Sequence, residues 1–351
     1  MSSKQFKIGN REIGPGHPPY IIAELSGNHN GDLRRALELI NAAHAAGADA
    51  VKLQTYTPDT MTIDFDSPEF RVNGGLWDGR TLYDLYKEAH TPWEWHTTIF
   101  AHARKLGIDI FSTPFDHSSV DFLKTLNVDV YKIASFELTD HPLIEAVAAT
   151  GKPIIMSTGM ATLSEIEESV EVARKAGCQA LCLLYCVSGY PTPVHDANIL
   201  TMPALQDHFD VVSGFSDHTL GTTASVVATS LGANVIEKHF TMKRSDGGPD
   251  AAFSLEPEEL AALVVDCRTA WEALGEAKFK RKSSENANVI FRRSIYVVKD
   301  IEEGEVITNE NVRVIRPGFG LPPKMLKNII GKQATISIKR GTALQAEMLK
   351  I

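Results

Sequence analysis

The sequence predicts an α/β protein whose larger part is a closed TIM (β/α)8 barrel, followed by a small β-rich domain. Between about residues 20 and 274, short apolar runs alternate eight times with longer segments whose apolar residues recur at helical spacing. Eight such units in about 255 residues fit a closed parallel barrel better than an open doubly wound sheet. The absence of a G-x-G-x-x-G motif after any predicted strand weakens the Rossmann alternative further.

Eight strands and eight helices are expected to alternate along the barrel. The strands are predicted at residues 20–25, 49–55, 108–113, 128–133, 153–157, 180–186, 211–216 and 234–240. The helices are predicted at residues 33–47, 92–106, 118–126, 142–149, 163–176, 200–209, 222–231 and 257–274.

One connection departs from the barrel pattern. Residues 56–91 separate the second strand from its helix, whereas loops at this place usually have about 2–6 residues. A long loop after a barrel strand lies at the carboxyl-terminal rim, where active sites are built. Two interpretations stay open: a lid that shapes the substrate site, or a helical insertion that covers the rim or joins an oligomer interface.

After Leu274 the sequence changes character. Residues 275–288 are polar and rich in lysine, which is typical of a linker. Strand-like runs, separated by turn sequences, follow at residues 294–298, 312–315 and 334–338. The expected parts are a barrel, a linker and a β-rich domain at residues 1–280, 281–290 and 291–351. A domain of about 60 residues is only marginally stable alone, so we expect it to pack against another surface.

The composition excludes several classes of protein. The 351 residues include 44 acidic side chains against 35 Lys and Arg, a formal net charge of −9, which argues against a nucleic-acid partner. Four cysteines are too few for a disulfide framework, and no apolar run is long enough to span a membrane. We therefore expect a cytoplasmic enzyme that acts on small molecules, with neither nucleic acid nor membrane as partner.

Polar residues lie at the carboxyl end of every predicted barrel strand, although a barrel core needs none of them. In barrels of this type, catalytic side chains come from several strands at their carboxyl ends. The polar residues at the strand ends are Glu24, Ser26, Asn28, His29, Lys52, Gln54, Ser112, Thr113, Lys132, Ser135, Glu137, Ser157, Thr158, Ser188, Tyr190, Ser216, Asp217, His218, Glu237, Lys238 and His239. Cys182 and Cys186 lie on one face of their strand, and we expect both in the core.

Lys52 and Lys132 lie inside apolar strands, where an unpaired ammonium would cost several kcal/mol. Each lysine must therefore meet an anion, unless it acts as a Schiff-base lysine with a lowered pKa. One possible anion is a carboxylate of the protein itself, from Glu24, Glu137 or Glu237. The other is a bound phosphate or carboxylate ligand, which the hydroxyl groups at neighbouring strand ends favour.

His218 and His239 lie at the ends of adjacent strands, so their imidazoles can converge on one ion. Two histidines with open positions would hold a divalent metal that stays accessible to substrate and water. The alternative is that each histidine is a hydrogen-bonded structural group. His29 is a candidate general base or substrate donor.

With these residues in place, the chain resembles the sialic acid synthase family, and within it the pseudaminic acid synthases. The motifs occur in family order over nearly the whole length, at residues 22–30 (IAELSGNHN), 47–56 (GADAVKLQTY), 131–137 (YKIASFE), 157–160 (STGM), 190–192 (YPT), 216–219 (SDHT) and 236–240 (IEKHF). The small domain resembles the family's antifreeze-like (SAF) domain, including residues 316–320 (RPGFG).

The resemblance implies condensation of phosphoenolpyruvate with the open-chain aldehyde of an N-acetylated sugar, giving a nonulosonic acid and phosphate by C–O cleavage. It implies Mn²⁺ or Mg²⁺ on His218 and His239, and catalytic roles for Glu24 and Glu137 as well as for the two histidines. The residues implied for phosphoenolpyruvate are Lys52, Thr113, Lys132, Ser135, Ser157, Ser188 and Ser216. Those implied for the sugar are Gln54, Glu137, Tyr190, Glu237, Asp250 and Arg316.

The resemblance also implies a homodimer, in which the antifreeze-like domain reaches over the partner's barrel and Arg316 completes the site in trans. Residues 73–78, 82–86 and 91–96 resemble pseudaminic acid synthases, which implies 2,4-diacetamido-2,4,6-trideoxy-L-altrose as substrate. Ser188 replaces an asparagine common in the neuraminate enzymes, whereas residues 248–250 look more like the neuraminate type. An N-acetylneuraminate or legionaminate synthase therefore stays an alternative. A non-catalytic sugar-binding or coat-polysaccharide assembly protein is a second alternative, which the intact lysine and histidine set opposes.

Overall fold

The computed structural model describes residues 5–350 and divides the chain into two units. The first unit ends at Gly275 and the second begins at Glu276. Among the described residues, no helix combines the length and the apolar character needed to cross a membrane.

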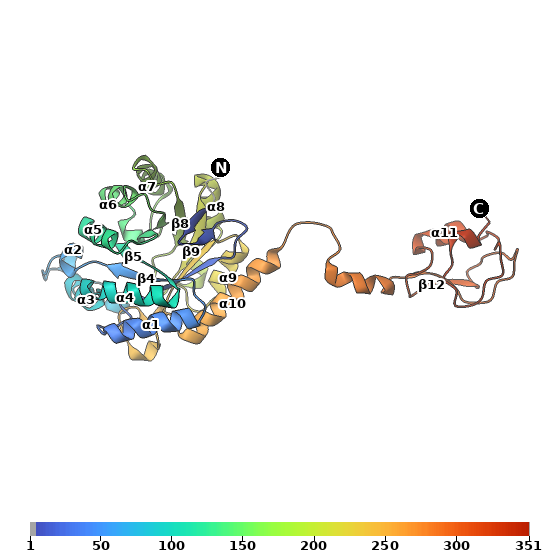
Figure 1. Ribbon diagram of the computed structural model, residues 1–351, viewed down its shortest axis with the longest axis horizontal. Helices are drawn as coiled ribbons and strands as arrows, with labels where there is room; N and C mark the ends of the chain where they lie inside the picture. Colours follow the sequence, from blue (N-terminus) through green and yellow to red (C-terminus); the bar gives the residue numbers. More distant parts are fainter. Residues whose placement is uncertain (1–4, 351) are drawn as a thin grey trace. The chain divides into compact units, whose positions relative to one another are not determined.

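The first unit is a closed barrel of eight parallel strands surrounded by helices (Figure 1). Its strands are β3 (Tyr20–Glu24), β4 (Ala50–Thr55), β5 (Asp109–Pro114), β6 (Tyr131–Ile133), β7 (Ile154–Ser157), β8 (Leu181–Cys186), β9 (Val212–Asp217) and β10 (Val235–His239). Strand β10 pairs with β3 as well as with β9, which closes the sheet. The predicted (β/α)8 barrel is confirmed, and each strand overlaps its predicted range.

Each barrel strand is followed by a helix that covers the outside of the sheet. These helices are α1 (Leu33–Ala45), α4 (Trp93–Leu106), α5 (His117–Thr125), α6 (His141–Ala148), α7 (Leu163–Lys175), α8 (Thr201–Phe209), α9 (Thr223–Ser230) and α10 (Pro257–Leu274). Side chains at Asp32, Asp116, Asp140 and Thr162 cap α1, α5, α6 and α7 by accepting first-turn N–H groups. Short polar residues thus set where these helices begin.

A hairpin that the sequence analysis missed lies before the barrel. Its strands β1 (Phe6–Ile8) and β2 (Arg11–Ile13) pair antiparallel, and Phe6, Ile8 and Ile13 join the apolar cluster inside the barrel. Strands of three residues are too short to show a periodicity. Arg11 also binds Asp49 just before β4, at the amino-terminal end of the barrel. The hairpin therefore packs at the end opposite the polar strand termini.

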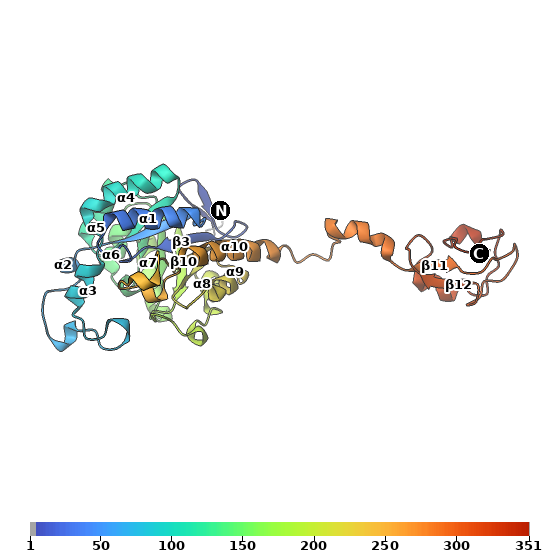
Figure 2. The ribbon, with the colours of Figure 1, turned by 90° about the horizontal axis from the view of Figure 1, so that it is seen from below.

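The long connection after β4 contains α2 (Pro58–Met61), η1 (Pro68–Phe70), η2 (Gly75–Trp77) and α3 (Leu82–Ala89). Figure 2 shows the stretch between α2 and α3 as a loop that projects from the barrel. We call residues 56–91 the excursion. Trp77 Nε1 donates a hydrogen bond of 2.8 Å to the carbonyl oxygen of Pro249, in the loop after β10. The excursion is thus partly helical and attached to the rim.

The second unit contains a small core and one antiparallel pair, β11 (Ser294–Val297) with β12 (Val312–Ile315). It also contains helix α11 (Leu326–Ile329). The strand predicted at residues 334–338 is wrong: Ala334 bridges Leu349 while Ile338 bridges Ile301, so no continuous ladder forms. The predicted linker contains a 3-10 helix, η7 (Ser283–Phe291), which its aperiodic sequence did not indicate.

We predict that Gly214→Ala destabilises the barrel. A Cβ atom at Gly214 would lie 2.2 Å from the carbonyl oxygen of Val235, its partner on β10, so the two strands would have to separate. We expect a loss of about 1–3 kcal/mol in unfolding free energy, measured by urea denaturation. Gly151→Asn is the control, because Gly151 has a φ of 70° and open space, which asparagine tolerates. Equal stability of the two variants would contradict the prediction.

Candidate active site

The carboxyl ends of the barrel strands bring four charged side chains together. Lys52 Nζ lies 2.9 Å from Glu24 Oε2 and 3.0 Å from Glu237 Oε2, and Lys132 Nζ lies 3.8 Å from Glu237 Oε1. All four side chains are at most 5% exposed. We call Glu24, Lys52, Lys132 and Glu237 the charged cluster. Of the alternatives weighed for the lysines, pairing with the protein's own carboxylates is what the structure contains.

In this cluster, burial disfavours the charged form of each side chain, whereas attraction between opposite charges favours it. Burial lowers the pKa of Lys52, and Glu237 opposes that shift. Burial alone would raise the pKa of Glu237, but Lys132 and Lys52 outweigh it and hold the pKa below its usual range. The Glu237 carboxylate therefore stays ionised between two lysines.

Hydroxyl groups from neighbouring strand ends surround the two lysines. Lys132 Nζ donates to Ser157 Oγ at 2.6 Å, and Ser216 Oγ donates to Glu237 Oε1 at 2.9 Å. Thr113 Oγ1 is buried and has no hydrogen-bond partner within residues 5–350. Burying a hydroxyl without a hydrogen-bond partner costs free energy, so Thr113 Oγ1 indicates a position for a polar ligand.

Ser135, Ser188 and Cys186 converge on Gly159, in the loop after β7. A Cβ atom at Gly159 would lie 2.3 Å from Ser188 Oγ and 2.8 Å from both Ser135 Oγ and Cys186 Sγ. Ser135 Oγ also accepts the Gly159 N–H at 3.2 Å and lies 3.0 Å from Cys186 Sγ. Cys186 is buried, as predicted, and in addition it contacts Ser135 at the carboxyl-terminal mouth of the barrel. Only its position at the last residue of β8 could have indicated this.

The two histidines predicted as metal ligands lie together, with ring centroids 5.4 Å apart. His218 Nδ1 donates to the carbonyl oxygen of Val187 at 2.9 Å, which leaves Nε2 as the acceptor. Nδ1 of His239 is buried without a hydrogen-bond partner in the described chain, 3.8 Å from Asp250 Oδ2. Burial lowers the pKa of both imidazoles, which keeps them neutral.

Neutral imidazoles fit a divalent metal, and the hydrogen bond to Val187 fixes the tautomer of His218. Within residues 5–350, no group of three or more His, Cys, Asp or Glu side chains is arranged to hold a metal. His218 and His239 are the side chains at this place that could hold such an ion, with its other positions open to substrate and water.

Aromatic rings extend from the histidines toward the excursion. Tyr190 lies 4.6 Å from His218 and 5.6 Å from Trp77, and Phe253 lies 4.9 Å from His239, measured between ring centroids. Trp77 is held at Pro249, next to Asp250. The excursion thus reaches the residues expected to contact the sugar.

The carboxyl groups of Asp250 and Glu137 hold their protons more tightly than usual. Burial raises the pKa of Asp250 to about 6, against a hydrogen bond from Ser26, and raises the pKa of Glu137 to about 7. Gln54 Nε2 donates to Glu24 Oε1 at 3.3 Å, so its amide adjoins the charged cluster.

One further candidate in the barrel is engaged in other contacts, and another belongs to the second unit. His29 lies 3.2 Å from Thr91 Oγ1 through Nε2 and accepts the Gly31 N–H on Nδ1, so both ring nitrogens are engaged in local contacts. Arg316 is exposed in the second unit, after β12.

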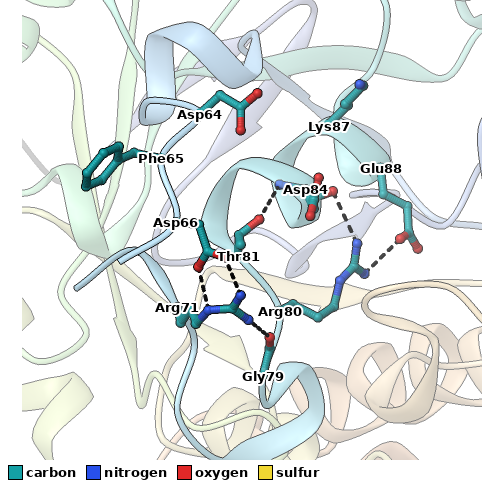
Figure 3. Close-up of a pocket in the computed structure, with 10 residues that line it drawn as sticks. All are labelled: Asp64, Phe65, Asp66, Arg71, Gly79, Arg80, Thr81, Asp84, Lys87 and Glu88. Carbon is teal, nitrogen blue, oxygen red and sulfur yellow. Dashed lines mark hydrogen bonds and ion pairs between the residues drawn. The ribbon is translucent and has the colours of Figure 1, made fainter. Parts of the chain in front are cut away.

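A hollow of about 660 Å³ lies in the excursion and contains none of the predicted site residues (Figure 3). Its two arginines are occupied locally: Arg71 pairs with Asp66 at 2.6 Å and Arg80 pairs with Glu88 at 2.7 Å. Lys87 is the remaining cation of the lining, and since no residue predicted for the chemistry lies in the hollow, we look for that chemistry at the carboxyl-terminal end of the barrel.

Family models and known proteins match nearly the whole chain. The NeuB family model matches residues 39–279, and the SAF domain model matches residues 292–350. The chain is 45% identical over 332 residues to the pseudaminic acid synthase of Helicobacter pylori, covering 94% of this chain and 97% of that relative. It is 37% identical over 356 residues to the N,N'-diacetyllegionaminic acid synthase of Legionella pneumophila, covering 100% of both.

A solved structure supports the same relationship. The N-acetylneuraminic acid (sialic acid) synthetase of Leptospira borgpetersenii, in complex with citrate, matches with a TM-score of 0.73 and 34% identity. The match covers 82% of this chain and 95% of that one. The resemblance to sialic acid synthases is confirmed, and the chain belongs to the NeuB family, with a SAF domain after its barrel.

Proposed function

We propose that the chain is a pseudaminic acid synthase. It would condense phosphoenolpyruvate with 2,4-diacetamido-2,4,6-trideoxy-L-altrose and release phosphate by C–O cleavage, which makes it a transferase. The observation that carries the chemistry is the charged cluster beside two neutral histidines at the barrel mouth. The choice of sugar rests on the 45% identity to a relative named pseudaminic acid synthase. Phosphoenolpyruvate is a cytoplasmic metabolite, so we place the enzyme in the cytoplasm.

The phosphoenolpyruvate site would be formed by the lysines and the hydroxyls around them. Thr113 Oγ1 is free of protein partners within the described residues, and Ser135 and Ser188 border the space that Gly159 leaves open. Ser157 and Ser216 hold Lys132 and Glu237 in position.

Charge balance supports a metal ion in the same site. The charged cluster carries two positive and two negative charges and is neutral as a whole. Phosphoenolpyruvate has a carboxylate and a phosphate and would add about three negative charges. A buried anion requires compensating charge. Mn²⁺ or Mg²⁺ on His218 and His239 would supply two positive charges, and Arg316 of the partner subunit would supply a third.

The reaction follows from this arrangement. The lysines and hydroxyls orient phosphoenolpyruvate so that its C3 attacks the aldehyde carbon of the sugar, leaving a cationic centre at C2. Glu24, ionised against Lys52, stabilises that centre and takes a proton from the water that adds to it. The resulting tetrahedral adduct expels phosphate by cleavage of its C2–O bond, and the new hydroxyl loses its proton to become the ketone of the product. Glu137, with a pKa of about 7, can supply the proton that turns the aldehyde oxygen into a hydroxyl. When bound, the metal supplies Lewis acidity toward the aldehyde.

Sugar recognition would fall to side chains around this centre. Gln54 adjoins Glu24, the ring of Tyr190 lies beside that of His218 at a tilt, and Asp250 lies near His239. Glu237 borders the same space from β10.

A homodimer would complete the site. Six apolar side chains are 51–71% exposed on the segments that follow β6 to β9, namely Phe136, Met160, Leu163, Val194, Leu200 and Leu220. Exposed apolar groups gathered at one side of a rim mark an interaction surface. We propose that the SAF domain of the partner subunit covers this surface and brings its Arg316 to the sugar, close enough to the phosphoenolpyruvate to offset its charge.

The proposed activity predicts substrate-dependent phosphate release. Purified protein with Mn²⁺ should release phosphate from phosphoenolpyruvate in the presence of 2,4-diacetamido-2,4,6-trideoxy-L-altrose, measured by a colorimetric phosphate assay. Preference for N-acetylmannosamine or for the legionaminate precursor would support the alternative synthases instead. No release with any of these sugars would leave only a non-catalytic sugar-binding role.

Metal removal should abolish this activity. Complete chelation is expected to lower the rate at least about 100-fold, because loss of Lewis-acid assistance is worth several kcal/mol. Mn²⁺ should restore the activity of the wild-type protein, but not that of His218→Ala. Phosphate release that is insensitive to chelation would refute the two-histidine metal site.

The partner's contribution can be tested by mixing two inactive variants. His218→Ala and Arg316→Ala, refolded or co-expressed together, should recover about a quarter of wild-type activity, because half the dimers then contain one intact site. As a control, His218→Ala mixed with the double variant carrying both changes should recover nothing. If Arg316 acts in cis, the first mixture will be as inactive as the control.

A further inference from the structure

A second buried ion pair lies directly beside the candidate metal ligands, outside the charged cluster. Lys238 Nζ lies 2.9 Å from Asp217 Oδ2, and both side chains are fully buried, at 0% exposure. The two residues face each other in the register of β9 and β10. Because side chains alternate along a strand, Lys238 points outward while its neighbours Glu237 and His239 face the mouth.

This pair also fixes the loop that follows β9. Lys238 Nζ donates to the carbonyl oxygen of Thr219, and Asp217 Oδ1 accepts the Thr219 N–H at 2.8 Å. Asp217 Oδ2 accepts the hydroxyl of Ser225, in α9, at 2.7 Å. Asp217 and Thr219, on either side of His218, are therefore both bound to the Lys238 side chain of β10, and Asp217 is also bound to α9.

Stability alone gives little reason for such a pair. Replacing a buried ion pair by apolar side chains is often neutral or stabilising, because two charges no longer have to be desolvated. Here one partner precedes His218 and the other precedes His239 in the sequence. A rigid link between these two positions sets how far apart the imidazoles stand.

We propose that Lys238 and Asp217 are positioning residues that hold His218 and His239 in the spacing required for a divalent metal. This inference rests on the proposed function, since it takes the two histidines as metal ligands. Groups that orient metal ligands from behind typically change metal affinity about 10–100-fold when they are lost. The structural pair would thus act on the metal without touching it.

The test compares two variants of the full chain. Lys238→Met should weaken Mn²⁺ binding to the metal-free protein about 10–100-fold in a calorimetric titration. It leaves Asp217 buried without its partner, so reduced stability is expected as well. The double variant Asp217→Asn with Lys238→Met removes both charges and should fold with a Tm close to that of the wild type. Its Mn²⁺ affinity should still be at least about 10-fold weaker, because the Thr219 carbonyl has lost its donor.

The values of kcat and KM distinguish a positioning role of Lys238 and Asp217 from a general loss of structure. In the double variant kcat should fall with Mn²⁺ affinity, whereas the KM for phosphoenolpyruvate should change little, because Lys52 and Lys132 are untouched. Asp49→Asn is the matched control: Asp49 is also a buried ion-pair partner, of Arg11 and Arg268, but it lies before β4 at the far end of the barrel. It should lower Tm without changing Mn²⁺ affinity.

Two results would overturn the inference. Wild-type Mn²⁺ affinity in the double variant would show that the pair has no positioning role. Equal loss of Mn²⁺ affinity in Asp49→Asn would show that any weakening of the barrel has the same effect. If the wild-type protein itself binds no Mn²⁺, the metal role under the proposed function fails, which is a distinguishable outcome.

Discussion

The site depends on one electrostatic constraint: Lys52 and Lys132 must be neutralised inside the barrel mouth. A buried ammonium is tolerated only beside an anion, and Glu237 lies between the two lysines while Glu24 pairs with Lys52. The register of the sheet makes this possible, because Glu24 lies opposite Lys52 on β4 and opposite His239 on β10. A slip of one residue in either strand would turn these side chains toward the helices.

Because side chains alternate along a strand, consecutive residues of β10 face opposite sides of the sheet. Glu237 and His239 face the mouth, while Lys238 between them reaches Asp217 and the loop behind His218. The opposite end of the barrel is filled by apolar side chains and the β1–β2 hairpin. The charged cluster therefore lies at the carboxyl-terminal mouth, and the apolar filling of the amino-terminal end keeps it away from water on that side.

Much of this was predictable from the sequence, and the limits have physical causes. Periodicity located all eight strands, and two lysines flanked by apolar residues indicated a polar mouth. What a single sequence does not reveal is the partner across the sheet. Lys238 differs from Lys52 only in facing outward, which depends on the register, and Cys186 adjoins Ser135 only because Gly159 leaves the space between them. The β1–β2 hairpin has strands too short to show a pattern.

The choice of sugar depends on contacts beyond those that bind phosphoenolpyruvate. Phosphoenolpyruvate is common to every condensation of this kind, so binding it does not distinguish one aldehyde from another. Discrimination requires contacts that differ between sugars, and the rings beyond His218 provide an apolar wall for them. Trp77 is the last ring of that wall, and its Nε1 donates a hydrogen bond to the carbonyl oxygen of Pro249, next to Asp250. The excursion, the least barrel-like part of the unit, is thereby placed where substrates that share the same chemistry would differ.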